Sequence, residues 1–276
     1  MSGKLYLVAT PIGNLDDITL RAINILKDVD IIAAEDTRHT LKLLNHLQIK
    51  KKLISYHRHN EEFKASVLME YLLNDNNIAL VSDAGTPGIC DPGHEIIKMA
   101  ISDNIEVIPI PGPCALINAL VASGFDTSEF SFYGFLPLNK KNRNEKLKEI
   151  NKENKTVILY EAPHKLLNTL KDIQKIRGDN VNIVLAKELT KIHEKFIRGN
   201  IKDIIENIQE IKGEFIILIE SNNNLNYKKD NIQYLEIDEL YDLYKLQGLE
   251  KKEIIKKIAK IKNVHKNEIY QYFLNK

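Results

Sequence analysis

A short apolar run followed by a long loop rich in glycine and proline constrains the fold of this chain more than any other stretch. The run Ile78–Val81 has the length and composition of a buried strand. The loop after it holds three glycines, two prolines and two aspartates within eleven residues. Its end predicts a helix that is capped by Asp91 and has Pro92 in its first turn. Because a plain strand–helix connection is usually only a few residues long, we predict a ligand-binding loop at the carboxyl end of this strand.

The succession of a buried strand, a loop and a helix occurs five times in about 120 residues. This succession is typical of a parallel sheet covered by helices. The predicted strands are Lys4–Ala9, Val29–Ala34, Leu53–Tyr56, Ile78–Val81 and Ile105–Ile110. Four of them end in polar or glycine- and proline-rich segments, which favours a nucleotide-like ligand. The first strand is not followed by GxGxxG, and GxxxxGK(S/T) is absent, which argues against an NAD enzyme and a P-loop NTPase.

The strand pattern restarts after a predicted linker at 124–128. The further strands are Phe130–Leu136, Thr156–Tyr160, Val181–Ala186 and Glu214–Ile219, in a mixed pattern that allows antiparallel pairs. A polar stretch at 221–231 with five asparagines predicts a second linker. Three short amphipathic helices follow, interrupted at Gly248 and Asn263, and this unit resembles a helix-turn-helix. Its lysines suit contact with nucleic acid, although a solvated lysine face is the commoner explanation. We therefore predict α/β domains at 1–122 and 123–221 and a helical domain at 232–276.

Composition limits the classes of protein that the chain can belong to. In 276 residues, 43% are hydrophobic and 28% are charged, which is usual for a globular protein, and the formal net charge of +1 says little about partners. The two cysteines, Cys90 and Cys114, form no CxxC pair, so a structural zinc site or a disulfide framework is not expected. This cysteine usage favours a reducing cytoplasm. The apolar runs are too short for a signal-peptide core or a membrane span.

Six loop motifs, taken in order, resemble those of one protein family. They are Val8–Leu15 (VATPIGNL), Ala34–Arg38 (AEDTR), Ser82–Gly88 (SDAGTPG), Pro111–Pro113 (PGP), Tyr160–His164 (YEAPH) and Ala186–Lys191 (AKELTK). Together they are similar to the bacterial 16S rRNA (cytidine 2′-O-ribose) methyltransferases of the small ribosomal subunit, which belong to the tetrapyrrole methylase superfamily. The resemblance runs from about Leu5 to Glu220, and the helical tail resembles the C-terminal domain of that family.

This resemblance implies two α/β domains of the tetrapyrrole-methylase (class III methyltransferase) type, with S-adenosylmethionine (SAM) bound in the cleft between them. It also implies a homodimer that methylates a cytidine near the decoding centre of the 16S rRNA in the assembled small subunit. The implied cofactor-binding residues are Pro11, Gly13, Gly85, Thr86, Pro87, Gly88, Cys114, Ala115, Tyr160 and Ala186. The chain departs from the family pattern at Cys90 and Cys114, where we expect serine; each change weakens one hydrogen bond.

Methyl transfer to a ribose hydroxyl requires alignment of the methyl group and an acceptor for the hydroxyl proton. Lys187 and Glu188 are the first candidates, because they follow a predicted strand on the side of the cleft. A desolvated lysine can act as the base and the glutamate can accept or orient the proton, whereas a surface salt bridge is the alternative interpretation. Glu161 forms a similar candidate pair with His164. No metal is suggested by the sequence.

Several charged residues suit contacts with the RNA substrate. Arg38 can hold a phosphate, although its neighbour Asp36 is better suited to tie loops together. His57 and Arg58 lie at the predicted mouth of the cleft, where a solvated loop is the alternative, and His164 is a further substrate-binding candidate. The basic segment that contains Lys140, Lys141, Arg143, Lys146 and Lys148 suits phosphate binding, although charge runs are usually just solvated.

Asp83 and the function itself leave alternatives open. Asp83 follows a strand, so it can bind the ribose or amino group of the cofactor or cap its own loop. The second function considered is a C- or N-methylase of a small tetrapyrrole, against which the Glu-Asp-Thr-Arg and Tyr-Glu-Ala-Pro-His motifs and the helical tail argue. The third is a non-catalytic SAM- or nucleotide-binding module that docks on the ribosome, which binding loops alone do not exclude.

Overall fold

The fold is taken from a computed structural model, which describes residues 2–208, 211–221, 235–246 and 249–274. The chain divides into two compact units, Met1–Glu220 and Ser221–Lys276. Most of the predicted linker at 221–231 and the predicted helix break at Gly248 lie outside the described residues. Within the described part of the chain, no helix is long and apolar enough to span a membrane.

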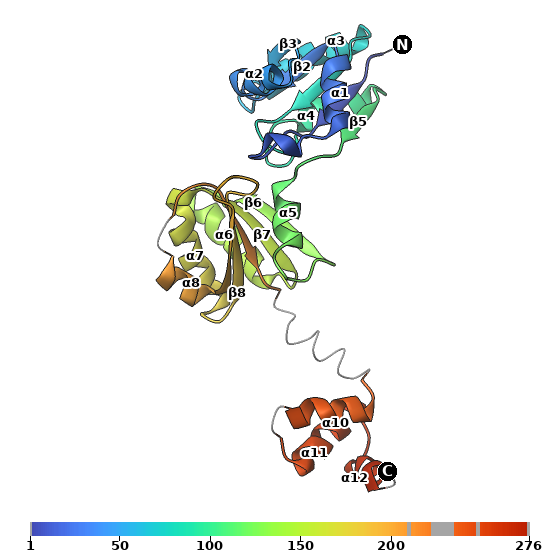
Figure 1. The fold of residues 1–276 in the computed structure, drawn as a ribbon, viewed down its shortest axis with the longest axis vertical. Helices are drawn as coiled ribbons and strands as arrows, with labels where there is room; N and C mark the ends of the chain where they lie inside the picture. The colour runs from blue at the N-terminus through green and yellow to red at the C-terminus, as the bar shows by residue number, and fades with distance from the viewer. Residues whose placement is uncertain (1, 209–210, 222–234, 247–248, 275–276) are drawn as a thin grey trace. The chain divides into compact units, whose positions relative to one another are not determined.

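The first sheet of the large unit is parallel throughout and confirms the predicted strand–helix units (Figure 1). Its strands are β1 (Leu5–Val8), β2 (Ile31–Ala34), β3 (Lys52–Ser55), β4 (Ile78–Val81) and β5 (Val107–Ile110), in the order β3-β2-β4-β1-β5. Both β2 and β4 are buried along their whole length, as expected for strands that are covered on both faces.

Helices cover both faces of this sheet. They are α1 (Leu20–Asp28), which follows the short 3-10 helix η1 (Leu15–Asp17), α2 (Thr37–His46), α3 (Glu61–Leu73) and α4 (His94–Ser102). Residues of α1 and α2 belong to the core on one face, and residues of α3 and α4 belong to the core on the other. The neighbouring strands β1 and β4 therefore lead to helices on opposite faces, which makes the gap between their carboxyl ends the switch point of the sheet.

The second sheet of the large unit is mixed, as the sequence predicts. Its strands are β6 (Phe130–Phe135), β7 (Thr156–Glu161), β8 (Asn182–Lys187), β9 (Lys195–Asn200) and β10 (Phe215–Ile219), in the order β6-β7-β10-β8-β9. The pair β6–β7 is parallel and the other three pairs are antiparallel. The sequence analysis missed β9, because an edge strand with lysine, arginine and glycine lacks the apolar signal of a buried strand.

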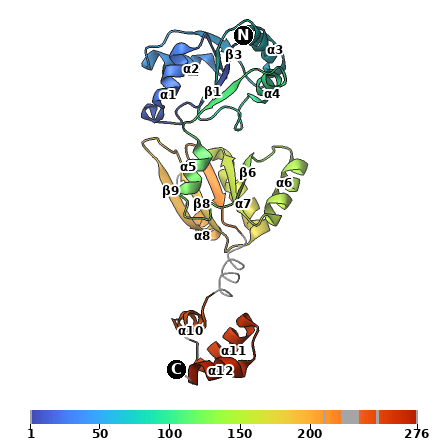
Figure 2. The same cartoon turned by 90° about the vertical axis from the view of Figure 1, so that its right-hand side faces the viewer.

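Helices also cover both faces of the second sheet: α6 (Lys140–Lys152), α7 (Pro163–Arg177) and α8 (Ile201–Asn207) on one, and α5 (Ala115–Val121) on the other. Figure 2 shows α5 against this second sheet. The prediction that α5 belongs to the first domain, at 1–122, was wrong in this respect. Leu116, Ala119 and Leu120 pack against apolar side chains of the second sheet, so the chain leaves the first sheet at 111–113.

The small unit contains the three predicted helices, α10 (Ile237–Leu246), α11 (Lys251–Lys262) and α12 (Lys266–Leu274). They surround a core that includes Leu240, Tyr244, Ile254, Ile258 and Ile269. Asn263 ends α11 in the left-handed conformation with φ 52°, which asparagine tolerates better than most residues, so the predicted break there is confirmed.

Candidate functional site

Hydrogen bonds tie together three of the first-sheet loops that the sequence marks as ligand-binding. The loops after β1 and β4 form an isolated bridge, in which Thr10 and Gly85 exchange backbone hydrogen bonds of 2.9 and 3.0 Å. The Thr10 hydroxyl donates to the Ser82 carbonyl at 3.1 Å. The Thr86 hydroxyl donates to the carbonyl of Pro113, after β5, at 3.1 Å. The switch point is therefore held as one rigid framework.

The loop after β4 differs from its prediction in one decisive respect. Helix α4 begins at His94 with no side-chain cap of its own, and neither Asp91 nor Pro92 is in it. Glu61 of α3 caps it instead, because its carboxylate accepts hydrogen bonds from the backbone N–H groups of Gly93 at 2.9 Å and Glu95 at 3.3 Å. The predicted capping role of Asp91 was wrong, since groups from other elements satisfy the helix terminus.

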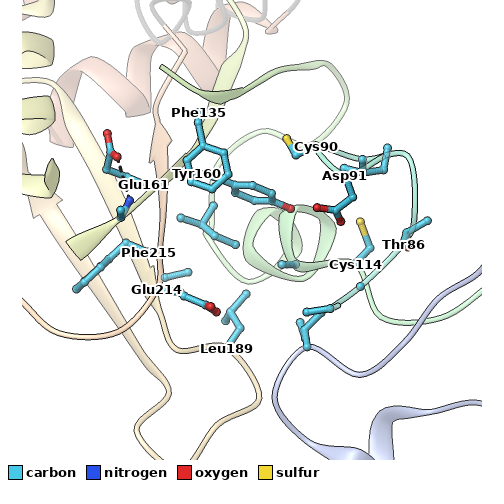
Figure 3. A pocket seen from close by; sticks show the side chains of 18 of the residues that line it. Thr86, Cys90, Asp91, Cys114, Phe135, Tyr160, Glu161, Leu189, Glu214 and Phe215 are labelled. Atoms are coloured by element: carbon cyan, nitrogen blue, oxygen red, sulfur yellow. Dashed lines mark hydrogen bonds between the residues drawn. The ribbon is translucent and has the colours of Figure 1, made fainter. Parts of the chain in front are cut away.

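Asp91 points into a cavity instead. Cys90 precedes it with φ 66°, a left-handed conformation that is unusual for a residue other than glycine, and this turns the chain just before Asp91. The Arg58 guanidinium donates a hydrogen bond to the Cys90 carbonyl and so holds this turn. In Figure 3 the Asp91 carboxylate points toward the hydroxyl of Tyr160, which comes from the second sheet.

The cavity between the loops of the first sheet and the strands of the second has a volume of about 340 Å³ (Figure 3). Its lining from the first-sheet side and α5 is Ile12, Ala84, Gly85, Thr86, Ile89, Cys90, Asp91, Cys114 and Ala115. Its lining from the second sheet and its loops is Phe135, Tyr160, Glu161, Ala162, Pro163, Ala186, Leu189, Glu214, Phe215 and Ile216. Six of the predicted cofactor-binding residues are therefore brought together, namely Gly85, Thr86, Cys114, Ala115, Tyr160 and Ala186.

Strand register decides which side chains of the second sheet reach the cavity. Tyr160, Ile216 and Ala186 are partners across β7, β10 and β8, and all three belong to the apolar cluster on the cavity side. We call this set the cavity row. The next residues form the opposite row, Glu161, Phe215 and Lys187, in the same register. Because side chains alternate along a strand, the opposite row faces the core that contains Leu159 and Leu185.

The three predicted catalytic residues are placed away from the cavity or are engaged elsewhere. Glu161 borders the cavity, but its carboxylate is turned from Tyr160 and accepts hydrogen bonds from the Thr169 hydroxyl at 2.5 Å and the Ala162 N–H at 2.9 Å (Figure 3). Lys187 lies in the opposite row. The register therefore argues against the predicted position of Lys187 on the side of the cleft.

Glu188 stabilises a loop. Its carboxylate accepts hydrogen bonds from the Glu214 N–H at 2.8 Å and from Lys191 at 3.0 Å. These bonds lower the pKa of Glu188, the backbone bond most. A β-carbon on Gly213 would lie 2.4 Å from this side chain, so glycine is required there. A carboxylate with a lowered pKa that is already bonded is a poor proton acceptor.

Five predicted cofactor-binding residues do not line the cavity but lie in the loops around it. Pro11 and Gly13 follow the bridged Thr10; a β-carbon on Gly13 would lie 2.5 Å from Lys191 and 2.8 Å from Thr190, so glycine lets the β8–β9 loop approach. Pro87 and Gly88 lie inside the loop that leads to Asp91. Asp83, the fifth residue, accepts a hydrogen bond from the Asp36 N–H at 3.0 Å and so joins the loops after β2 and β4.

The predicted substrate-binding residues are dispersed, and none of them lines the cavity. Arg38 is 88% exposed and pairs with Asp36 at 2.7 Å, and hydrogen bonds from Arg38 lower the pKa of Asp36. His57 is hydrogen-bonded to Asn60, and Arg58 to the Cys90 carbonyl. His164 is exposed near the start of α7. In the basic segment, Arg143 forms an ion pair with Asp172 and Lys146 forms one with Glu149. The predicted phosphate-binding role therefore fits the other lysines of the segment better, namely Lys140, Lys141 and Lys148.

Electrostatics single out Asp91 among the side chains at the cavity. Burial, followed by the negative charge of Glu35, raises the pKa of Asp91 to about 6. Glu35, at the end of β2, also has a raised pKa, mainly through burial and then through Asp83. Burial raises the pKa of Tyr160 and of Cys90 as well. A carboxyl with such a pKa in a cavity marks a candidate functional group, and the sequence analysis missed it because Asp91 looked like a helix cap.

The residues present fit SAM. The walls combine small residues that leave space, namely Gly85, Ala115 and Ala186, with apolar surface from Tyr160 and Ile216 that suits a purine ring. Among the described residues, no three His, Cys, Asp or Glu side chains form a group that could hold a metal ion.

Comparison with known proteins defines the class. Residues 4–205 match the family model described as Tetrapyrrole (Corrin/Porphyrin) Methylases. The methyltransferase CobJ has the same fold, with a TM-score of 0.62 and 14% identity, over 80% of this chain and 95% of that chain. So has the uroporphyrin-III C-methyltransferase of Thermus thermophilus complexed with S-adenyl homocysteine, with a TM-score of 0.57 and 15% identity, over 78% and 97%. The two-sheet fold with its cavity is that of a tetrapyrrole methylase.

Within that class, a nearly full-length relative narrows the assignment. The ribosomal RNA small subunit methyltransferase I of Halalkalibacterium halodurans is 46% identical over 275 residues, which cover 98% of this chain and 94% of that protein. The chain therefore belongs to the ribosomal RNA small subunit methyltransferase I family, as the loop motifs indicate.

Proposed function

We propose that this protein transfers a methyl group from SAM to the 2′-hydroxyl of a cytidine in the 16S rRNA of the small ribosomal subunit, near the decoding centre. The observation that carries the proposal is the cavity at the switch point, in a chain that is related over nearly its whole length to a small-subunit rRNA methyltransferase. We further propose that it acts as a homodimer in the cytoplasm. We also propose that the chain has two α/β domains and a C-terminal helical domain, and that the boundary between the two α/β domains lies before α5.

The cavity residues would hold the cofactor and leave its methyl group accessible to the RNA. SAM, when bound, supplies an electrophilic methyl group on a positively charged sulfur. The ring of Tyr160 makes edge contacts with Phe132 and Phe135, with centroids 5.0 and 5.7 Å away, and so forms part of an aromatic wall. Thr86 and Gly85 are held by the loop framework described above. Positioning by such fixed walls supplies much of the catalysis of an in-line transfer.

The direct test uses labelled SAM and small ribosomal subunits from cells that lack this enzyme. The rRNA is extracted after incubation and hydrolysed in alkali. Because a 2′-O-methyl group removes the nucleophile that cleaves the neighbouring phosphodiester, the proposal predicts one labelled, alkali-resistant dinucleotide with cytidine at its 5′ side. If the RNA carries label but alkali releases all of it as mononucleotides, the methyl group is not on the ribose and the proposal is contradicted.

Two further results would point to the other functions. SAM binding without label in any RNA, but with methylation of a tetrapyrrole, would identify a small-molecule methylase. SAM binding without any transfer would identify a binding module. Free 16S rRNA serves as the matched control substrate, since the proposal requires the assembled subunit.

A further inference from the structure

The proposed reaction needs a proton acceptor, and the cavity offers few. Among the residues that line it, the carboxylates are Asp91, Glu161 and Glu214. Glu161 is turned toward α7 and is hydrogen-bonded there. The Glu214 side chain is 80% exposed and pairs with Lys191 at 3.0 Å. Asp91 is therefore the carboxylate whose position and surroundings suit proton transfer inside the cavity.

The loop after β4 is built so that Asp91 can face the cavity. Glu61 and the Tyr56 hydroxyl accept hydrogen bonds from the first N–H groups of α4, so Asp91 is not needed as a cap. The left-handed Cys90, held by Arg58, turns the chain just before Asp91. In strand β6, Gly134 has φ 61°, and a β-carbon there would lie 2.8 Å from the Cys90 sulfur. Glycine thus allows the second sheet to close over this loop.

The groups around Asp91 come from every element that packs against it. Glu35 and Asp83 contribute negative charge from the ends of β2 and β4, and Arg58 contributes positive charge from the segment after β3. Ser82 and Cys90 belong to its own loop, and Tyr160 faces it from β7. Burial and the acidic neighbours raise the pKa to about 6, so the group is ionised at neutral pH yet binds a proton more strongly than an ordinary aspartate.

Tyr160 does not compete for the proton. Burial, followed by the nearby Cys114, raises the pKa of its hydroxyl above the ordinary value, so it remains protonated at neutral pH. Its ring contacts Phe132 and Phe135, and its hydroxyl lies opposite the Asp91 carboxylate (Figure 3), so it is suited to guide a substrate hydroxyl toward Asp91 rather than to accept its proton.

We propose that Asp91 is the catalytic base, which accepts the proton of the ribose 2′-hydroxyl during methyl transfer. The 2′-oxygen forms a bond to the methyl carbon while the bond from that carbon to sulfur breaks. The electron pair of the broken bond stays on the sulfur, which becomes neutral, and the hydroxyl proton moves to the Asp91 carboxylate. This inference rests on the proposed function.

The test compares wild type with Asp91→Asn and Asp91→Glu. Single-turnover methylation of small subunits is measured at saturating SAM, and SAM affinity is measured separately by calorimetry. Asp91→Asn should lower the single-turnover rate by about 10²- to 10⁴-fold and change the SAM affinity by less than about threefold, whereas Asp91→Glu should restore part of the rate. Asp103→Asn, the same change at the other end of α4, is the control and should leave both quantities unchanged.

A second readout follows the proton. The wild-type single-turnover rate should fall below about pH 6 with a slope of one proton, and carbon NMR of labelled aspartate should show one carboxyl that titrates there and is lost in Asp91→Asn. Wild-type enzyme that places no label in rRNA contradicts the proposed function. An active wild type with an equally active Asp91→Asn contradicts the role of Asp91. An Asp91→Asn variant whose lost rate is matched by lost SAM affinity also overturns it, because Asp91 is then a cofactor contact.

Discussion

The two rows of side chains at the ends of the second-sheet strands lie one residue apart and have different surroundings. The cavity row, Tyr160, Ile216 and Ala186, is apolar or aromatic and faces the cavity. The opposite row places two charged residues, Glu161 and Lys187, on either side of Phe215, which packs in the core on that face. The two charged residues that the sequence suggests for catalysis are thus on the side of the core, and the apolar residues of the cavity row face the cavity.

The difference teaches that the position of a residue on its strand, rather than its chemical type, decides whether its side chain faces the cavity. A shift of one residue exchanges the two faces of a strand completely. The Thr169 hydroxyl that binds Glu161 also accepts a hydrogen bond from Arg143 at 2.8 Å, so this carboxylate belongs to a network that joins β7, α6 and α7. Four substitutions, the first of which compares the two rows directly, test this account of the site from the largest expected effect to the smallest.

Ala186→Leu should have the largest effect on ligand binding. Ala186 is 1% exposed and lines the cavity, so a longer side chain fills the space for SAM and overpacks its wall. We expect a loss of SAM affinity of about 10- to 100-fold, equivalent to roughly 1–3 kcal/mol. Calorimetry measures it, and the neighbouring Lys187→Ala is the matched control. If Lys187→Ala weakens SAM binding as much as Ala186→Leu, the division between the two rows is wrong.

Gly13→Ala should have the next largest effect, although Gly13 does not line the cavity. The new β-carbon would lie 3.0 Å from the Leu189 carbonyl, in addition to the clashes with Thr190 and Lys191. Because Leu189 lines the cavity, displacement of its loop should lower SAM affinity by about tenfold, at a cost within the usual range for overpacking. A thermal melt separates this effect from unfolding. Unchanged affinity with an unchanged melting temperature would mean that the loop moves freely and is not part of the wall.

Part of this site is predictable from the sequence, because short sequence patterns around the residues indicate their position. Gly85, Thr86, Cys114 and Ala115 lie in loops whose glycines and prolines follow buried strands, so the pattern alone places them at one sheet edge. The first sheet was predicted for the same reason, since its strands are short apolar runs.

The remainder depends on partners far away in the chain. Asp91 looks like a cap until Glu61, thirty residues earlier, is seen to occupy that role. The packing of α5 on the second sheet depends on residues beyond 150, to which the helix sequence gives no clue. The face on which Lys187 lies depends on the register of β8 with β10, which the sequence of one strand does not contain.

Asp91→Asn should also change the pH dependence of stability. The pKa of Asp91 is about 6 in the folded protein against an ordinary value of 3.8, so its contribution to stability is complete below about pH 4 and is lost as the pH rises through 6. At pH 8 the variant should be more stable than wild type by on the order of 1 kcal/mol after allowance for partial exposure, or roughly 2–4 °C in melting temperature. The two melting curves should coincide at pH 4. A variant that is less stable than wild type at pH 8 would contradict the unfavourable placement of this charge.

Arg38→Ala should have the smallest effect on the folded protein. The side chain is 88% exposed, and its pairing with Asp36 is a surface ion pair. Such pairs contribute about 0–1 kcal/mol, so we expect little change in a urea melt and none in SAM affinity. Methylation of small subunits by this variant tests separately whether Arg38 touches RNA. A large loss of SAM affinity would mean that the loop after β2 supports the cavity more than its contacts indicate.

The central claim, that the cavity between the two sheets holds SAM, is tested most directly through its two thiols. Cys90 and Cys114 are the only cysteines of the chain, both are free, and both line the cavity. Iodoacetamide alkylation of each thiol is followed by mass spectrometry with and without saturating S-adenosylhomocysteine. The account predicts that the ligand slows alkylation of both thiols at least tenfold. Unchanged alkylation rates for both, at ligand concentrations that saturate binding in calorimetry, would place the cofactor elsewhere and contradict the account.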